Sequence, residues 1–252
     1  MSDFEGKRIL VIGASSGIGA ETACVLGEKN AEVILVARRK DKLEEVCKGI
    51  QSNRTKYYTY DISDIDGIEE LIKCIVSENG KLDGLVYVAG MSNADVPIKF
   101  LTYERQISTF NTNYFGFMEC VRQVTKKGRY NEGFRIVSIS SIAAIRGDKC
   151  HATYAATKAA MDASIRCIAK ELAPKKICIN SVAPSMVKTE MYDSYIKMQG
   201  DAKLANERIL DRQYLGIAET RDVSNAIVFL LSEEARFITG IALPVDGGYS
   251  AS

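Results

Sequence analysis

The sequence predicts an α/β protein with one doubly wound, seven-stranded parallel sheet and helices on both of its faces. Short apolar runs of strand length alternate with longer segments of helical periodicity along almost the whole chain. A glycine-rich turn directly follows the first apolar run, where parallel sheets of this kind bind nucleotides. At 252 residues the chain is long enough for one or two domains, and we expect a single domain over residues 1–252.

The expected strands are short and apolar, as strands covered on both faces should be. They span residues 8–12, 32–37, 56–60, 84–88, 134–139, 177–182 and 241–245. The expected helices span residues 18–28, 40–51, 64–77, 103–127, 153–172 and 220–231. Residues 187–217 interrupt the alternation, and an insertion of this length in a compact domain usually covers a ligand site. We therefore expect this insertion to be a substrate loop.

Charge and hydropathy exclude several classes of function. The chain has 33 Lys and Arg against 32 Asp and Glu, so no overall field favours nucleic acid or an anionic membrane. No apolar run approaches the roughly 20 residues that span a bilayer, and the acidic N-terminus does not resemble a secretion signal. We expect a cytoplasmic protein without nucleic-acid or membrane partners.

Cysteine and histidine usage predicts no metal site. The seven cysteines are scattered and contain no Cys-x-x-Cys pair, which argues against zinc and against a disulfide framework. Most of them lie in apolar surroundings and are expected to be small core residues of a reducing compartment. His151 is the only histidine, and we expect it in a loop or at the start of a helix, with substrate contact as the alternative.

A cofactor site is predicted where the first strand runs into Gly-Ala-Ser-Ser-Gly-Ile-Gly. Glycines permit a tight turn with close backbone approach, and a helix N-terminus offers N–H groups and a positive dipole end to a pyrophosphate. A plain strand-to-helix turn is the alternative, but a second strand about 20 residues on favours a dinucleotide-binding (Rossmann) unit. The expected contacts are Gly13, Ser15, Ser16, Gly17, Ile18 and Gly19.

The end of the second strand favours NADP(H) over NAD(H). An NAD-binding protein places an acid there, whereas this chain has Arg38 and Arg39. Arginine can form planar, charge-assisted contacts with the 2′-phosphate of NADP, and the alternative is a solvated basic helix start. After the third strand, Asp61 and Ile62 are expected beside the adenine, although Asp61 capping the next helix is also open.

Acid–base chemistry is predicted on the helix at 153–172. Tyr154 and Lys158 are four residues apart, so the phenol and the ammonium share one helical face. A positive charge beside a phenol favours phenolate, which would make Tyr154 an acid or base near neutral pH. This spacing also arises by chance, but Ser140 and Ser141 follow the preceding strand at the same edge of the sheet, where a serine hydroxyl can hold a substrate oxygen.

Together these motifs resemble the short-chain dehydrogenase/reductase family over essentially the whole chain. The family's glycine turn and Tyr-x-x-x-Lys pair are matched, and its catalytic serine, thirteen residues before the tyrosine, falls on Ser141. Its Asn-x-x-Gly stretch selects Asn113 as the catalytic asparagine rather than Asn111. The resemblance also implies cofactor contacts from the ends of the fourth and sixth strands, namely Ala89, Gly90, Pro184, Val187 and Thr189.

The resemblance implies hydride transfer between a nicotinamide and a carbonyl or secondary alcohol. In it Tyr154 gives a proton to the substrate oxygen, Ser141 polarises the carbonyl and Lys158 binds the ribose and lowers the tyrosine pKa. Asn113 would hold a water that links Lys158 to solvent. The general pattern is closest to 3-oxoacyl-acyl-carrier-protein reductases. The alternatives are a sugar, polyol or steroid alcohol dehydrogenase, or a catalytically silent NADP(H)-binding sensor or subunit.

Two partners follow from the same resemblance. An acyl-carrier protein would meet basic residues near two loops, which are Lys126, Lys127, Arg129, Lys175 and Lys176, although such charges are usually only solvated. A homotetramer would form through helices 103–127 and 153–172 and the C-terminal strands.

The sequence departs from the family at three places. Ile12 stands where a threonine is usual, and Tyr87-Val88-Ala89-Gly90 stands where Asn-Asn-Ala-Gly is usual. Both partners of a polar contact are thus lost together, so we expect an apolar contact there, with cofactor binding retained. Ser185 replaces a glycine in the expected nicotinamide loop.

Overall fold

The computed structural model describes residues 4–50, 54–92 and 96–251 and contains the predicted sheet. Seven strands pair in the order β3-β2-β1-β4-β5-β6-β7, and every pair is parallel. The strands are β1 Arg8–Ile12, β2 Glu32–Ala37, β3 Lys56–Thr59, β4 Leu82–Tyr87, β5 Tyr130–Ile139, β6 Cys178–Pro184 and β7 Ala242–Val245. The reversal of strand order between β1 and β4 is the position at which such sheets bind ligands.

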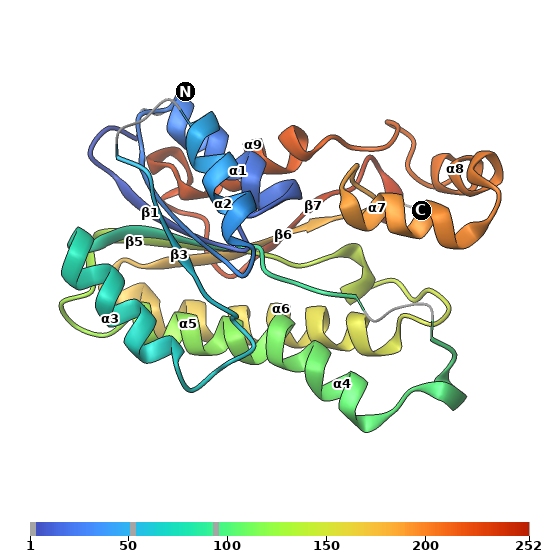
Figure 1. Cartoon of the computed structure of the whole chain (residues 1–252), viewed down its shortest axis with the longest axis horizontal. Coiled ribbons are helices and arrows are strands. Elements are labelled where there is room, and N and C mark those ends of the chain that lie inside the picture. Colours follow the sequence, from blue (N-terminus) through green and yellow to red (C-terminus); the bar gives the residue numbers. More distant parts are fainter. Residues whose placement is uncertain (1–3, 51–53, 93–95, 252) are drawn as a thin grey trace.

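Helices cover both faces of this sheet. They are α1 Gly17–Glu28, α2 Lys40–Gly49, α3 Ile68–Asn79, α4 Tyr103–Phe110, α5 Gly116–Val124, α6 Ala152–Leu172, α7 Glu190–Gln199, α8 Ala202–Leu210 and α9 Thr220–Leu231. Helices α1, α2 and α9 lie on one face, and α3, α5 and α6 lie on the other (Figure 1). Alternate residues of β1 therefore enter different cores: Val11 packs with the first group, whereas Leu10 and Ile12 pack with the second.

Three predicted helices differ from their expected bounds by two residues or more. The helix expected at 64–77 begins at Ile68, because Asp64 joins a turn in which its N–H donates to the Asp61 carbonyl. The helix expected at 103–127 ends at Val124 and contains one π turn, Asn111–Phe115, between α4 and α5. Such a turn inserts an extra residue without ending the helix, so apolar periodicity alone does not reveal it. The predicted 40–51 helix ends at Gly49, and Gln51 lies outside the described residues.

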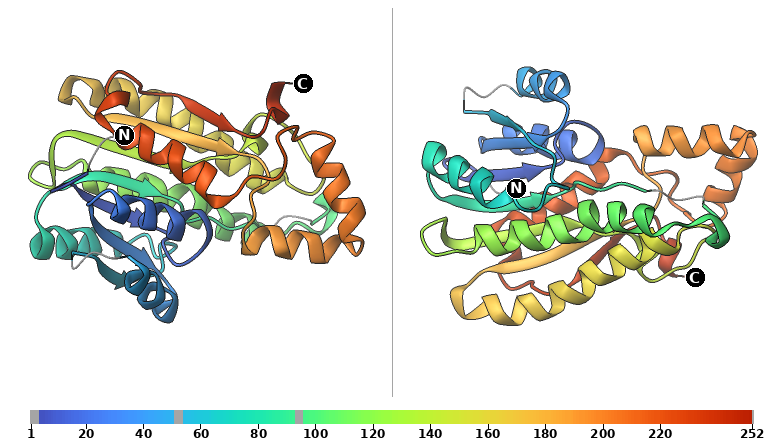
Figure 2. Two further views of the ribbon diagram at one scale, coloured as in Figure 1. Left: turned by 90° about the horizontal axis from the view of Figure 1, so that it is seen from above. Right: turned by 60° about the horizontal axis from the view of Figure 1, so that its bottom comes forward.

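The insertion at 187–217 is helical. Helices α7 and α8 form it, and they extend from the carboxyl-end side of the sheet (Figures 1 and 2). Thr189 and Asp201 cap their N-termini, and Gly200, with φ of 75°, turns the chain between them. A bridge between Val187 and Ala218 closes the base of the insertion.

The cysteines differ in their burial. Cys120 and Cys178 are buried, and the partly buried Cys24 and Cys47 pack against a core cluster, whereas Cys74 and Cys167 are exposed and Cys150 is intermediate. The expected core surroundings are therefore found for four of the seven cysteines. Cys74 and Cys167 lie on the exposed faces of α3 and α6, away from the residues that these two helices bury. All seven thiols are free. Among the described residues, no helix combines the length and the hydropathy needed to cross a membrane.

Candidate active site

The glycine turn between β1 and α1 fits a dinucleotide. A Cβ at Gly13 would lie 2.5 Å from the Ala89 nitrogen, and one at Gly19 would lie 2.2 Å from the Gly13 oxygen, so side chains at these positions are excluded. Ser16 is the N-cap residue of α1, yet its side chain makes no capping hydrogen bond, and the first turn contains no acid. The N–H groups of this turn are therefore available to an anion such as a pyrophosphate.

The departure at Ile12 produces the expected apolar contact. Ile12 is buried, stands opposite Tyr87 in the β1–β4 register and packs in the same core cluster. The backbone completes the contact, because the Ile12 carbonyl accepts hydrogen bonds from the N–H groups of Val88 (2.8 Å) and Ala89 (3.0 Å). The turn is thus held without the polar pair that is usual in the family, and retained cofactor binding stays a prediction.

The two arginines after β2 point to different partners. Arg39 lies over the glycine turn, with Nη2 2.6 Å from Ser16 Oγ and Nε 3.4 Å from Ser15 Oγ. Its Nη1 also donates to the Glu190 carboxylate, 3.2 Å away at the start of α7. Arg38 turns towards Asp61, with 3.6 Å between Nη1 and Oδ2. Arg39 is therefore the arginine that contacts the glycine turn.

Asp61 caps a local turn rather than α3. Its Oδ1 accepts hydrogen bonds from the Ser63 N–H (3.0 Å) and the Ser63 hydroxyl (2.8 Å). Partial burial opposes ionisation, but the bonds from Ser63 and the charge of Arg38 lower the pKa of Asp61 below its usual value. Ile62, the next residue, is buried.

Ser141, Tyr154 and Lys158 converge at the carboxyl end of β5. The Lys158 ammonium is buried and donates to the Ile139 carbonyl at 2.6 Å, and it lies 5.7 Å from the centroid of the Tyr154 ring. Ser141 lies close enough to the Tyr154 hydroxyl to lower its pKa, and Ser141 Oγ accepts a hydrogen bond from the Ala143 N–H at 3.1 Å. The three groups predicted from separate parts of the sequence therefore form one cluster.

Asn113 lies in the π turn and connects the neighbouring elements. Its Oδ1 accepts from the Met91 N–H (2.8 Å), and its Nδ2 donates to the Met91 carbonyl (2.9 Å) and to Thr157 Oγ1 (3.1 Å). Thr157 precedes Lys158 on α6. Met91 follows Gly90, and it is Gly90 that lies beside the Lys158 ammonium. The buried carboxamide thus joins the chain after β4 to the catalytic helix.

Burial controls the proton affinities of the cluster. It raises the pKa of Tyr154, and the hydrogen bond with Ser141 opposes this increase. Burial also lowers the pKa of Lys158 to about 8, while the Asp162 carboxylate opposes this decrease. The expectation that the phenol shifts towards phenolate is thus wrong for the chain without cofactor, because burial raises the pKa of Tyr154.

Sequence reasoning missed Gln213, which fixes the loop after β6. Pro184 ends β6, and at Met186 the backbone N–H donates to Gln213 Oε1 (3.1 Å) while the carbonyl accepts from Gln213 Nε2 (3.0 Å). Gln213 therefore holds the loop that contains Ser185 through both the N–H and the carbonyl of Met186. No local pattern marks Gln213, since its partner lies 27 residues away in the chain.

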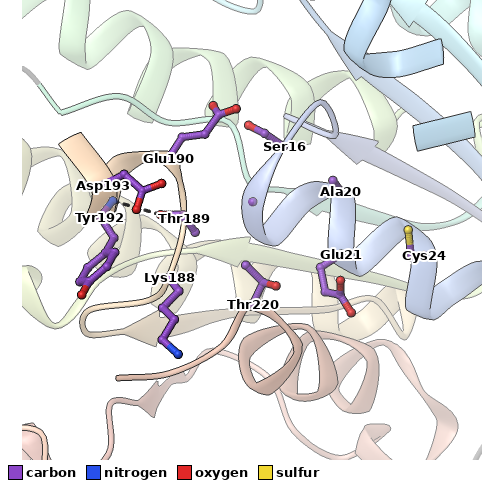
Figure 3. Close-up of a pocket in the computed structure, with 11 residues that line it drawn as sticks. Ser16, Ala20, Glu21, Cys24, Lys188, Thr189, Glu190, Tyr192, Asp193 and Thr220 are labelled. Atoms are coloured by element: carbon purple, nitrogen blue, oxygen red, sulfur yellow. Dashed lines mark hydrogen bonds between the residues drawn. The ribbon is translucent and has the colours of Figure 1, made fainter. Parts of the chain in front are cut away.

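Thr189 and Glu190 bring α7 against the glycine turn. The Thr189 methyl is the nearest atom to a Cβ built on Gly17, at 3.2 Å. A cavity of about 520 Å³ lies between α1 and the start of α7, and Ser16 and Glu190 lie on the same side of it (Figure 3). Neither Ser141 nor Tyr154 lines this cavity, so it adjoins the phosphate end of the site rather than the chemical end.

His151 has the position that the sequence predicts. It is the N-cap residue of α6, and its Nδ1 lies 2.9 Å from the Lys149 carbonyl. The imidazole lies edge-on to the Tyr154 ring, with 6.3 Å between centroids. It therefore borders the cluster from the helix start.

The fold and this arrangement define a doubly wound, dinucleotide-binding oxidoreductase. The family model described as enoyl-(acyl carrier protein) reductase matches residues 13–250. The L-xylulose reductase of Caenorhabditis elegans is 37% identical over 251 residues, which cover 98% of this chain and 97% of that protein. The 3-oxoacyl-[acyl-carrier-protein] reductase FabG of Thermotoga maritima is 30% identical over 248 residues, covering 97% of this chain and 98% of that protein.

Solved structures agree with these relatives. Levodione reductase superposes with a TM-score of 0.94 at 26% identity, over 99% of each chain. ElxO with NADP bound superposes with a TM-score of 0.89 at 31% identity, over 98% of this chain and 99% of that one. The protein belongs to the short-chain dehydrogenase/reductase family, whose members use a nicotinamide cofactor to interconvert carbonyls and alcohols.

Proposed function

We propose that this protein is an NADP(H)-dependent carbonyl reductase. The observation that carries the proposal is the cluster of Ser141, Tyr154 and Lys158 at the sheet edge that also bears the glycine turn. The alternative of a catalytically silent sensor is less well supported, because a silent protein has no need to retain this set together with Asn113.

The preference for NADP(H) is supported by charge at the end of β2. Arg38 and Arg39 are exposed there, and Arg39 already donates to hydroxyls of the glycine turn. A 2′-phosphate beside Ser15 would be within the same hydrogen-bonding network. The nearby carboxylates of Asp61 and Glu190 are paired with these arginines, which reduces their repulsion of a phosphate.

The mechanism follows from the environment of each group. A bound nicotinamide supplies the hydride or accepts it. Tyr154 keeps its proton at neutral pH because burial raises its pKa, so it is suited to protonate a substrate oxygen during reduction. Ser141 shares the hydroxyl side of Tyr154 and orients that oxygen, while the Lys158 ammonium stabilises negative charge beside the phenol. Asn113 fixes α6 against the chain after β4.

Two substrate classes remain as candidates. The FabG relatives act on 3-oxoacyl groups of an acyl-carrier protein, and this reaction is our first proposal for the class. However, Lys126 and Arg129 are both paired with Glu69, and Lys176 is paired with Glu132, so less positive charge is available to an acidic carrier than the sequence indicates. This pairing, with the 37% identity to an L-xylulose reductase, supports a free sugar or polyol carbonyl as the second candidate.

We also propose that the protein forms a homotetramer, as the family resemblance implies. Phe115 of the π turn and Phe237 and Ile241 before β7 are exposed apolar residues on the elements expected at the interfaces. Light scattering on the purified protein checks this assembly, and a monomeric mass would contradict it.

The test is a turnover assay with NADPH and NADH against a panel of ketones. The panel contains acetoacetyl thioesters, free and carrier-bound, together with open-chain ketoses and a steroid ketone. Oxidation of NADPH with any of these carbonyls, faster than oxidation of NADH, is the expected result. Tight NADPH binding without turnover of any of them would instead support the sensor. A thioester that reacts only when carrier-bound identifies the carrier as a partner.

A further inference from the structure

Asp162 connects the catalytic helix to two strands. It lies one helical turn after Lys158 on α6 and is buried. Its Oδ2 accepts a hydrogen bond from Ser140 Oγ and its Oδ1 accepts one from Ser181 Oγ, each at 2.7 Å. Both serines are fully buried: Ser140 directly precedes Ser141, and Ser181 lies in β6. The carboxylate therefore holds α6 against the strand end that bears Ser141.

Packing alone does not explain a carboxylate at this position. Burial of a charge is costly unless the charge is paired, and apolar residues often replace buried polar groups without loss of stability. Among the described residues, no cation forms an ion pair with Asp162, whose two oxygens meet neutral hydroxyls. The group on which its negative charge acts is the Lys158 ammonium, one helical turn away on α6.

The surroundings of Lys158 identify Asp162 as the charge that acts on it. The β5 end contributes the Ile139 carbonyl, and the β4 end and the π turn contribute Gly90 and Asn113, none of which is ionisable. On α6, the neutral Tyr154 ring lies 5.7 Å from the ammonium. Asp162 is the charged group whose field favours the protonated amine and opposes the effect of burial.

We propose that Asp162 is a positioning residue of this active site, which orients Ser141 through Ser140 and keeps Lys158 positively charged. The inference rests on the proposed function, because it takes Ser141 and Lys158 to be catalytic groups. It adds a charged positioning residue behind the Tyr154 and Lys158 pair, without requiring that Asp162 contact substrate or exchange a proton.

The charge of Lys158 is tested by its titration in the cofactor-free protein. Lysine labelled with ¹³C at Cε reports each amine by NMR, and loss of one signal in Lys158→Arg assigns Lys158. We expect a midpoint at about 8 in the unmodified chain, a lower midpoint in Asp162→Asn and a midpoint near the original in Asp162→Glu, which keeps the charge. An unchanged midpoint in folded Asp162→Asn would overturn this part of the proposal, and this readout does not depend on turnover.

The orientation of Ser141 is tested by two serine variants that remove equivalent bonds. Ser140→Ala and Ser181→Ala each delete one hydroxyl from the same carboxylate, but only Ser140 adjoins Ser141. We expect Ser140→Ala to lower kcat roughly tenfold with NADPH affinity unchanged, and Ser181→Ala to lower it less, because misplacement at the reacting group reduces the rate. Equal losses, or no loss in Ser140→Ala, would overturn the orienting role.

The two arms separate this inference from the proposed function. Failure of the unmodified protein to turn over any carbonyl contradicts the carbonyl reductase but leaves the Lys158 titration decisive for Asp162. Turnover by the unmodified protein, with an unchanged Lys158 midpoint in Asp162→Asn, contradicts the role of Asp162 alone.

Discussion

The two ends of the candidate site are built in different ways. At the chemical end, Asn113, Lys158 and Asp162 are buried and their polar atoms are bonded to fixed groups of the sheet and of α6. At the phosphate end, Arg38 and Arg39 are exposed and bond to Asp61 and Glu190. The first end is therefore rigid before any ligand binds, whereas the second must exchange its partners when a phosphate arrives.

This difference indicates which properties are easy to change. Chemistry depends on backbone contacts and buried hydrogen bonds, so a substitution there has large effects that neighbouring residues do not relieve. The proposed preference for NADP(H) depends on solvated charges, whose individual interactions are weak and replaceable. Five substitutions test this contrast, in order of decreasing expected effect.

Tyr154→Phe tests the rigid end most directly. Loss of the phenol hydroxyl removes the proton donor, and we expect kcat to fall roughly a thousandfold, within the range for general acid catalysis. NADPH affinity, measured by fluorescence titration, should change little. Tyr58→Phe is the matched control, because its hydroxyl bonds to Glu78 at the far edge of the sheet. Retention of most of the turnover in Tyr154→Phe would contradict the proposed mechanism.

Arg39→Ala and Arg38→Ala test the exposed end. Loss of a charge-assisted contact with the 2′-phosphate should weaken NADPH binding about 10- to 100-fold. The effect on NADH should be much smaller, because NADH lacks that phosphate. Lys40→Ala removes a neighbouring exposed charge that pairs with Glu44 and serves as control. Equal losses for the two cofactors in both arginine variants would exclude NADP(H) selection by these residues.

Tyr87→Phe tests the support of the π turn. The buried Tyr87 hydroxyl donates to the Thr112 carbonyl, and burial holds its pKa well above the usual value, so it remains a neutral donor. Its loss leaves a carbonyl without its partner and should reduce the free energy of unfolding by about 1–2 kcal/mol, measured in denaturant. Tyr57→Phe, whose partner is the partly exposed carboxylate of Glu44, should lose less. The reverse order would show that the π turn does not need this hydroxyl.

Glu190→Gln should have the smallest effect of these substitutions, and it should strengthen NADPH binding rather than weaken it. Glu190 competes with a phosphate for Arg39, so its neutralisation should tighten NADPH binding by roughly two- to fivefold, the scale of an exposed ion pair. Asp193→Asn removes an equivalent charge from the first turn of α7 without a contact to Arg39. The same gain in both variants would indicate a general effect of charge rather than competition for Arg39.

The parts that sequence predicted are those with local patterns. Strands of the sheet, the glycine turn and the Tyr154–Lys158 spacing depend on residues close together in the chain, and the family resemblance added Ser141 and Asn113. Partners far apart in sequence were missed: Glu190 is 151 residues from Arg39, and Asp162 meets serines on two separate strands. One signal was available for Asp162, an acid on the inner face of α6 one turn after Lys158.

The remaining errors have physical causes of the same kind. The helix expected from residue 64 begins at Ile68, because Asp64 belongs to a preceding turn that its backbone N–H closes on the Asp61 carbonyl. The direction of the Tyr154 pKa depends on burial, which only tertiary structure determines. A helix with apolar residues on both sides of Asn111–Phe115 gave no indication of the π turn.

The contact of α7 with the glycine turn has a consequence for the kinetics. Thr189 packs beside Gly17, and Glu190 is bonded to Arg39, so α7 contacts residues proposed to hold the dinucleotide. We therefore expect occupancy of the proposed dinucleotide site to affect the position of α7, the start of the insertion predicted to be a substrate loop. The kinetic counterpart that we predict is a compulsory order, in which the dinucleotide binds before the carbonyl and leaves after the other product.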